Sequence, residues 1–339
     1  MLNILYNNAG LRSVKCVLSI LLVLGLFTAP VLFAQSAESA LSPEAQTAFN
    51  RGLAAARQQE WRLAIKYFEE AQKAAQEDSE VLFNLALAYD KADALLPAAV
   101  WFKAYLVVKP EAHNAGDVQE RIDDLLVKYE ASVWKLIEST EKMTSNTLKE
   151  FDGLGIKSWR MYQAIGALIA ARVEMGDIRG AEQLAVTWKL KDQPYERRDE
   201  LYQSLYKALA CVGKIDAAKK YALLASPNWS DTALRNELDK NSEGFRGWQK
   251  SLQDQSWKEN WGATKYEIKA WGNFFDRVDT FNNYTIQSPW GNKAVHNFAN
   301  FWESIENKDP IERVQILSKV VYYMAAAWDY FQRMELLYQ

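Results

Sequence analysis

The sequence is poor in the residues that tight turns and reactive sites require. Gly and Pro together make up 23 of the 339 residues, about 7 %, whereas about 12 % is usual. Only two cysteines and two histidines are present. A long chain with few turn-forming residues favours helices over many short strands, and 49 % of the residues are apolar, enough to build a large core. We therefore expect an all-α protein.

The shortage of cysteine and histidine also restricts the chemistry. Any nucleophile that needs an imidazole base would have to use His113 or His296. The neighbours of Cys211 are apolar, so we interpret it as a buried small residue and not as a reactive thiol. No Cys pair and no HxxxH or HExxH spacing is present, which argues against a zinc site. We expect no catalytic residue, no metal and no cofactor.

Two further patterns are candidates for reactive sites and lack the required features. The segment GLGIKS at 153–158 has no Gly directly before Lys157, so we interpret it as a hinge and not as a phosphate-binding loop. Carboxylate pairs such as Asp123-Asp124 lie among other charged residues, where solvated helix faces are expected. Acid–base catalysis instead needs two carboxylates in different environments across a cleft.

The first 34 residues have the form of a secretory signal. Arg12 and Lys15 precede an apolar run over residues 16–33, and small residues follow at 34–37. We expect residues 1–34 to be removed and the protein to be exported, with the periplasm of a Gram-negative bacterium as its location. The alternative is an inner-membrane anchor formed by residues 16–33, since this length is near the lower limit for a membrane span. Membrane contact is expected only in that case.

Net charge limits the partners. Removing residues 1–34 takes away two basic residues and no acidic ones, which shifts the net charge from −3 to −5. Nucleic-acid binding normally needs a basic face, so we expect no nucleic-acid partner. Cys211 would be the only remaining cysteine, which leaves no intramolecular disulfide.

The N-terminal third contains an internal repeat with an offset of 34 residues. Small residues recur at the same places, as do asparagine and phenylalanine: the aligned pairs are Gly52 with Ala86, Ala64 with Ala98, Asn50 with Asn84, and Phe68 with Phe102. Two antiparallel helices approach closely only where side chains are short, so the small residues predict helix crossing points. Ser42-Pro43 predicts the start of the first helix, with Ser as its N-cap.

These two units, 45–78 and 79–112, resemble the tetratricopeptide repeat (TPR) family. The second unit is the closer match, with residues of the expected type at Leu82, Asn84, Leu85, Ala86, Tyr89, Ala98, Phe102 and Pro110. The first unit lacks the large residue expected at Ala55 and the closing proline. The resemblance implies stacked helical hairpins, an α-solenoid, in which the first helix of each hairpin lines a partner-binding surface.

A second internal repeat, with an offset of 37 residues, lies over about 160–226. The segments MGDIRGAEQLA and VGKIDAAKKYA each predict a helix end, a glycine turn and a new helix that opens with small residues. We interpret them as two degenerate TPR-like hairpins. Between the two repeat pairs, residues 115–147 have the pattern of an amphipathic helix. The expected domains are therefore 42–150 and 157–228, followed by 229–339.

Region 229–339 is rich in tryptophan, and two long helices are predicted in it. One carries an apolar stripe from Trp257 to Val278, and the other begins at Asp309-Pro310 and carries a stripe from Val314 to Phe331. The spacing indicates that most of these tryptophans belong to a core. Trp290 lies off both stripes in a turn-rich segment and is the candidate for a glycan-binding residue.

Two functions follow from these patterns. The first is a non-enzymatic scaffold that binds a protein or peptide of unknown identity. On the TPR resemblance, the partner-binding residues are Phe49, Asn50, Leu53, Phe83, Asn84, Leu87 and Lys91. The asparagines would bond the backbone of an extended peptide or would only stabilise the repeat, and the two readings remain open. The alternative function is a cell-wall glycan-binding or lytic protein that uses the tryptophan-rich region.

Overall fold

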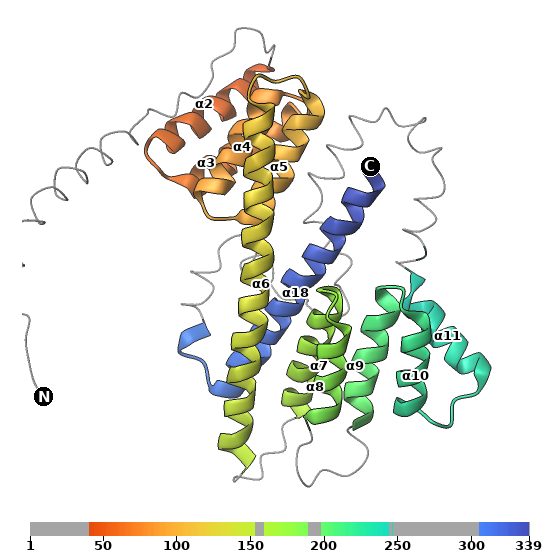
Figure 1. Ribbon diagram of the computed structural model, residues 1–339. Helices are drawn as coiled ribbons and strands as arrows, with labels where there is room; N and C mark the ends of the chain where they lie inside the picture. The colour runs from red at the N-terminus through yellow and green to blue at the C-terminus, as the bar shows by residue number, and fades with distance from the viewer. Residues whose placement is uncertain (1–40, 153–158, 189–197, 244–245, 247–304, 339) are drawn as a thin grey trace, which may run out of the picture. The chain divides into compact units, whose positions relative to one another are not determined.

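The computed structural model describes residues 41–152, 159–188, 198–243, 246 and 305–338, all within one compact unit that spans Leu41–Gln339. The described residues form helices and contain no strand, which confirms the all-α fold. The helices (Figure 1) are α2 Pro43–Arg57, α3 Trp61–Ala74, α4 Ser79–Lys91, α5 Leu95–Val108, α6 Ala115–Asp152, α7 Trp159–Glu174, α8 Ile178–Thr187, α9 Arg198–Cys211, α10 Ile215–Ala225, α11 Asp231–Asn241 and α18 Pro310–Tyr338.

The predicted helix starts are confirmed by their caps. The Ser42 hydroxyl accepts the backbone N–H of Ala45 at 3.2 Å, and Pro43 is the first residue of α2. At α18, the Asp309 carboxylate accepts the N–H groups of Ile311 and Glu312 at 3.0 and 3.1 Å. These side chains satisfy donors that the first turn of a helix leaves without partners.

The same turn geometry connects the two helices of each of four helical hairpins. A residue with positive φ follows α2, α4, α7 and α9, and these residues are Gln59 (60°), Asp93 (58°), Gly176 (81°) and Gly213 (78°). The next residue donates its N–H to the carbonyl five residues earlier: Glu60 to Ala55 (3.0 Å), Ala94 to Tyr89 (3.0 Å), Asp177 to Arg172 (2.8 Å) and Lys214 to Leu209 (2.8 Å). This is the Schellman ending of a helix. Because this turn recurs, the residues of all four hairpins can be aligned by counting from the positive-φ residue. We call this alignment the common frame, and a helical repeat protein requires one.

The common frame also explains the small residues. The fifth residue after each positive-φ residue is an alanine with no exposed surface, and these are Ala64, Ala98, Ala181 and Ala218. Within α2, Gly52 is buried so closely against Phe68 of α3 that an added Cβ would lie 2.5 Å from the ring. The predicted crossing point at Gly52 is therefore a close approach between α2 and α3, and the predicted alanines are buried.

Helix α6 is longer than predicted and continues to Asp152. Two arginine–carboxylate pairs connect it to its neighbours. Arg121 of α6 binds Asp90 of α4, with Nε 2.9 Å from Oδ2. Arg172 of α7 binds Glu141 of α6 through both Nε and Nη2, at 2.6 and 2.8 Å. The long helix thus joins the first pair of hairpins to the second.

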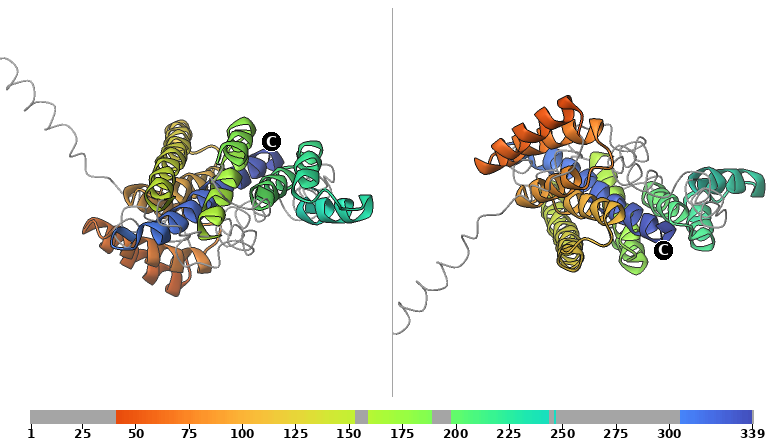
Figure 2. Two further views of the ribbon diagram at one scale, coloured as in Figure 1. Left: turned by 90° about the horizontal axis from the view of Figure 1, so that it is seen from below. Right: turned by 90° about the horizontal axis from the view of Figure 1, so that it is seen from above.

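Helix α18 returns from the C-terminal part of the chain and packs on α6 and α7, as Figures 1 and 2 show. The predicted stripe is buried or nearly so, and it contributes Leu317, Val321, Met324 and Phe331 to a core that includes residues of α5, α6 and α7. In α7 this core contains Leu168 and Ala171. Counted back from the positive-φ residue, the corresponding residues of α4 are Leu85 and Ala88. Both are also buried, and α4 packs on α3. Hence α18 packs on both α6 and α7, and the residues of α7 in its core lie at places that are also buried in α4.

Several predictions concern residues outside the described ranges. They include the secretory signal or anchor at 1–34, the hinge at 153–158, the stripe from Trp257 to Val278, and Trp290. Among the helices that the structure describes, none combines the length and the hydropathy needed to cross a bilayer.

Candidate partner-binding surface

The predicted partner-binding residues lie on α2 and α4, and three of them are buried. The exposed fractions are 3 % for Phe49, 5 % for Leu53 and 1 % for Asn84. Phe49 packs against Phe68 with ring centroids 5.6 Å apart. In this structure a partner can reach the other four residues of the set and not these three, because the neighbouring helices cover them.

Asn84 has a structural role on α4. Its amide nitrogen donates to the carbonyl oxygen of Glu80 at 2.8 Å, within the same helix. Its Oδ1 is buried and has no hydrogen-bond partner among the described residues. The asparagines were predicted either to bond a partner or to stabilise the repeat. For Asn84 the donation to Glu80 favours stabilisation of the repeat. Its unpaired oxygen leaves one acceptor unsatisfied. Asn50 differs, because it is exposed and accepts from the Gln46 side chain at 3.1 Å.

Phe83 and Leu87 provide the accessible apolar area on α4, since both are partly exposed. Phe83 is fixed in place by aromatic contacts with α5, at 5.8 Å from Phe102 and 5.1 Å from Tyr105 between ring centroids. A side chain that is held by its neighbours and still accessible loses little conformational entropy when a partner binds. These two residues are the apolar part of the candidate surface.

The cationic part of the surface contains a second residue, Arg57, besides the predicted Lys91. Lys91 is exposed at the last residue of α4, and Arg57 is exposed at the last residue of α2. Both lie two residues before a positive-φ residue, so they occupy equivalent places in their hairpins. The 34-residue offset that aligned Asn50 with Asn84 also aligns Arg57 with Lys91, and this signal was present in the sequence. We call Asn50, Arg57, Phe83, Leu87 and Lys91 the inner surface.

Acidic groups lie beside the inner surface, and their charge is partly compensated. Asp90 is bound by Arg121, with Nη2 2.5 Å from Oδ1. Burial raises the pKa of Glu80, the nearby Asp78 raises it further, and Lys109 opposes the change. Of these acidic groups, Asp90 is therefore already paired within the protein.

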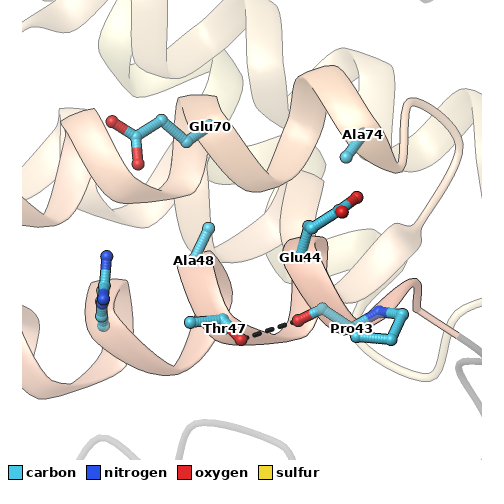
Figure 3. Close-up of a pocket in the computed structure, with 7 residues that line it drawn as sticks. Pro43, Glu44, Thr47, Ala48, Glu70 and Ala74 are labelled. Atoms are coloured by element: carbon cyan, nitrogen blue, oxygen red, sulfur yellow. Dashed lines mark hydrogen bonds between the residues drawn. The ribbon is translucent and has the colours of Figure 1, made fainter.

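A shallow hollow of about 460 Å³ lies elsewhere on the first hairpin. It is formed by α2 and α3 and lined by Pro43, Glu44, Thr47, Ala48, Arg51, Glu70 and Ala74, as Figure 3 shows in part. The Thr47 hydroxyl donates to the carbonyl oxygen of Pro43 at 2.7 Å, so its proton is engaged within the helix. No residue of the inner surface lines this hollow, and its side chains include no thiol or imidazole.

Reactive groups are scarce in the part of the chain that is described. No group of three or more His, Cys, Asp or Glu side chains there could hold a metal ion. The Cys211 thiol donates to the carbonyl oxygen of Asn241 at 3.3 Å. Burial raises its pKa to about 12, and the nearby Glu174 adds to the increase, so the thiolate is rare at neutral pH.

Two of the described tryptophans in the C-terminal region belong to packed aromatic contacts. Trp229 lies edge-on to Tyr206 at 5.9 Å between centroids. Trp328 stacks on Phe331 at 5.9 Å and also contacts Tyr129. These contacts agree with the prediction of a core role for Trp328, and the glycan-binding role of Trp290 remains a prediction.

Comparisons of this chain with protein-family models, with curated proteins and with solved structures found no match.

Proposed function

We propose that this protein is a TPR scaffold that binds a protein or peptide partner through its inner surface and catalyses no reaction. The observation that carries the proposal is the turn that four hairpins share, at offsets of 34 residues in the first pair and 37 in the second. Stacked hairpins of one design present extended surfaces made from equivalent residues, and repeat proteins use such surfaces to bind partners.

The chemistry of the inner surface indicates what the partner carries. Phe83 and Leu87 offer apolar contact, while Arg57 and Lys91 offer positive charge at the ends of neighbouring first helices. A matching segment would place an apolar side chain against Leu87 and an acidic group near Lys91. Both cations also complement the negative ends of their helix dipoles, which accounts for their position in the absence of a partner.

The proposed location is the cell envelope. Residues 1–34 have the three parts of a secretory signal. The partner is then an envelope protein or a segment of one, reached in the periplasm of a Gram-negative bacterium.

Affinity capture from an envelope extract tests the proposal. The bait is the wild-type protein, and the test variant is Leu87→Glu with Lys91→Glu, which removes apolar contact and reverses one charge. The matched control is Leu63→Glu with Lys66→Glu on α3, where both side chains are also exposed. A protein captured by the wild type and the control but lost from the test variant supports the proposal. Equal capture by all three baits would place the binding site elsewhere.

A further inference from the structure

A cluster of buried ionisable groups lies where α18 meets the ends of α7 and α9. Glu174 is the last residue of α7 and is 6 % exposed. Asp329 and Arg333 come from α18, and Arg333 Nη2 lies 2.6 Å from Asp329 Oδ2. The same nitrogen donates to the carbonyl oxygen of Cys211, the last residue of α9, at 3.2 Å. This arginine therefore connects α18 to α9.

The charges in this cluster do not balance when every group is ionised. Glu174 and Asp329 are two carboxylates, and Arg333 supplies the single guanidinium between them. The other titratable groups that face the cluster are Tyr322 of α18 and Cys211 of α9, with Lys207 of α9 farther out and exposed. Full ionisation would leave one uncompensated negative charge in a buried place, which is costly.

One retained proton removes that excess charge. Burial raises the pKa of Glu174 well above its ordinary value, and the nearby Asp329 raises it further, while Arg333 opposes the change. The interaction between the two side chains raises the pKa of Glu174 and lowers that of Asp329, so Glu174 is the group that keeps the proton. The Oε1 atom of Glu174 is buried and has no partner among the described residues, so ionisation at this place would find no further donor there.

We propose that Glu174, Asp329 and Arg333 form a proton-dependent latch that holds the C-terminal half of α18 against α7 and α9. The latch lies at the far end of the helix from the Asp309 cap, and α18 is separated in sequence from the helices it joins. Loss of the shared proton would leave both Glu174 and Asp329 negatively charged. Their repulsion would loosen that end of α18. The array would then lose part of the helix that packs on both α6 and α7.

The sign of the pH dependence follows from the raised pKa of Glu174. The folded latch holds a proton that the unfolded chain releases above the ordinary glutamate pKa of about 4.3. The stabilisation is therefore complete below that pH and is lost as the pH rises through the folded-state pKa.

Hydrogen exchange of the full-length protein, followed by mass spectrometry, tests the latch. We expect the protection of peptides from the C-terminal half of α18 to fall about tenfold or more as the pH rises from near the ordinary glutamate pKa of about 4.3 into the alkaline range, after correction for the intrinsic exchange rate. The variant Glu174→Gln keeps a neutral donor to Asp329 and should lose this pH dependence. Glu138→Gln, at an exposed site on α6, is the matched control and should behave like the wild type.

A second variant covers the case in which Glu174→Gln does not fold. Asp329→Asn leaves one carboxylate beside Arg333, so Glu174 can ionise and the pH dependence should again shrink. The proposal is overturned if wild-type α18 shows no change in protection with pH. It is also overturned if both variants keep the wild-type pH dependence, or if α2–α5 lose protection to the same extent as α18.

Discussion

Gly52 and Phe68 are so close that a Cβ atom added to the glycine would lie 2.5 Å from Cδ1 and Cε1 of the ring. Phe68 is fully buried and also packs against Phe49, so the ring has little room to move. We expect Gly52→Ala to lower the free energy of unfolding by about 1–3 kcal/mol. Denaturant titration measures this change.

Gly116 offers the matched control for that substitution. It lies near the start of α6, and an added Cβ there meets no atom within 4 Å. Gly116→Ala should raise the free energy of unfolding by about 0.5–1 kcal/mol through helix propensity alone. If both glycine substitutions had the same effect, the close approach of α2 and α3 would be contradicted.

The shared turn predicts that substitutions at equivalent places in two hairpins change the stability of the protein in opposite directions. Gln59 adopts φ of 60° without the freedom of glycine, so Gln59→Gly should stabilise the protein by about 0.5–1 kcal/mol. Gly176 has φ of 81° and open space around its Cβ position, so Gly176→Ala should cost about 1–2 kcal/mol through backbone strain alone. Thermal unfolding of both variants measures the two shifts. A neutral Gly176→Ala would show that this turn is not maintained in solution.

The pair between Arg172 and Glu141 should make a measurable contribution to stability. Both side chains are largely buried, at 17 % and 16 % exposure, and the pair is bidentate. A double-mutant cycle with Arg172→Met and Glu141→Gln should give a coupling energy of about 1–3 kcal/mol. The same cycle on Arg246 and Asp239, each 52 % exposed, should give less than about 0.5 kcal/mol. Equal coupling energies would mean that α6 and α7 are not joined as described.

The Cys211 thiol should react slowly in the folded protein. With its pKa raised to about 12 by burial, the thiolate fraction near pH 8 is about a thousandfold below that of a free cysteine. Alkylation of the Cys211 peptide, quantified by mass spectrometry, should therefore be slow in buffer and fast in denaturant. Rapid alkylation in the native protein would contradict the raised pKa of this half-buried thiol.

Much of the fold could be predicted because helices depend on local patterns. The 34-residue offset identified Ala64 and Ala98, and the caps at Ser42 and Asp309 marked two helix starts. The turns of the second repeat pair were visible because each contains a glycine at the positive-φ place. Those of the first pair contain Gln59 and Asp93, which carry no such signal, so the common frame of all four hairpins emerged only from the structure.

The position of α18 could not be predicted, because its contacts with α6 and α7 join residues far apart in the sequence. A stripe such as Val314 to Phe331 predicts that one face is buried and does not identify the helices that bury it. The same limit applies to the candidate site. The pattern could not separate Phe83, which is partly exposed, from Phe49, which is buried at the equivalent place.

The most direct test of the proposed function is a binding titration between the purified protein and the partner that it captures, or a peptide from that partner. We predict that Leu87→Glu with Lys91→Glu raises the Kd about tenfold or more, which corresponds to about 1.4 kcal/mol. Leu63→Glu with Lys66→Glu should leave it within about twofold. An unchanged Kd for a folded inner-surface variant would contradict the account, because α4 would then take no part in binding.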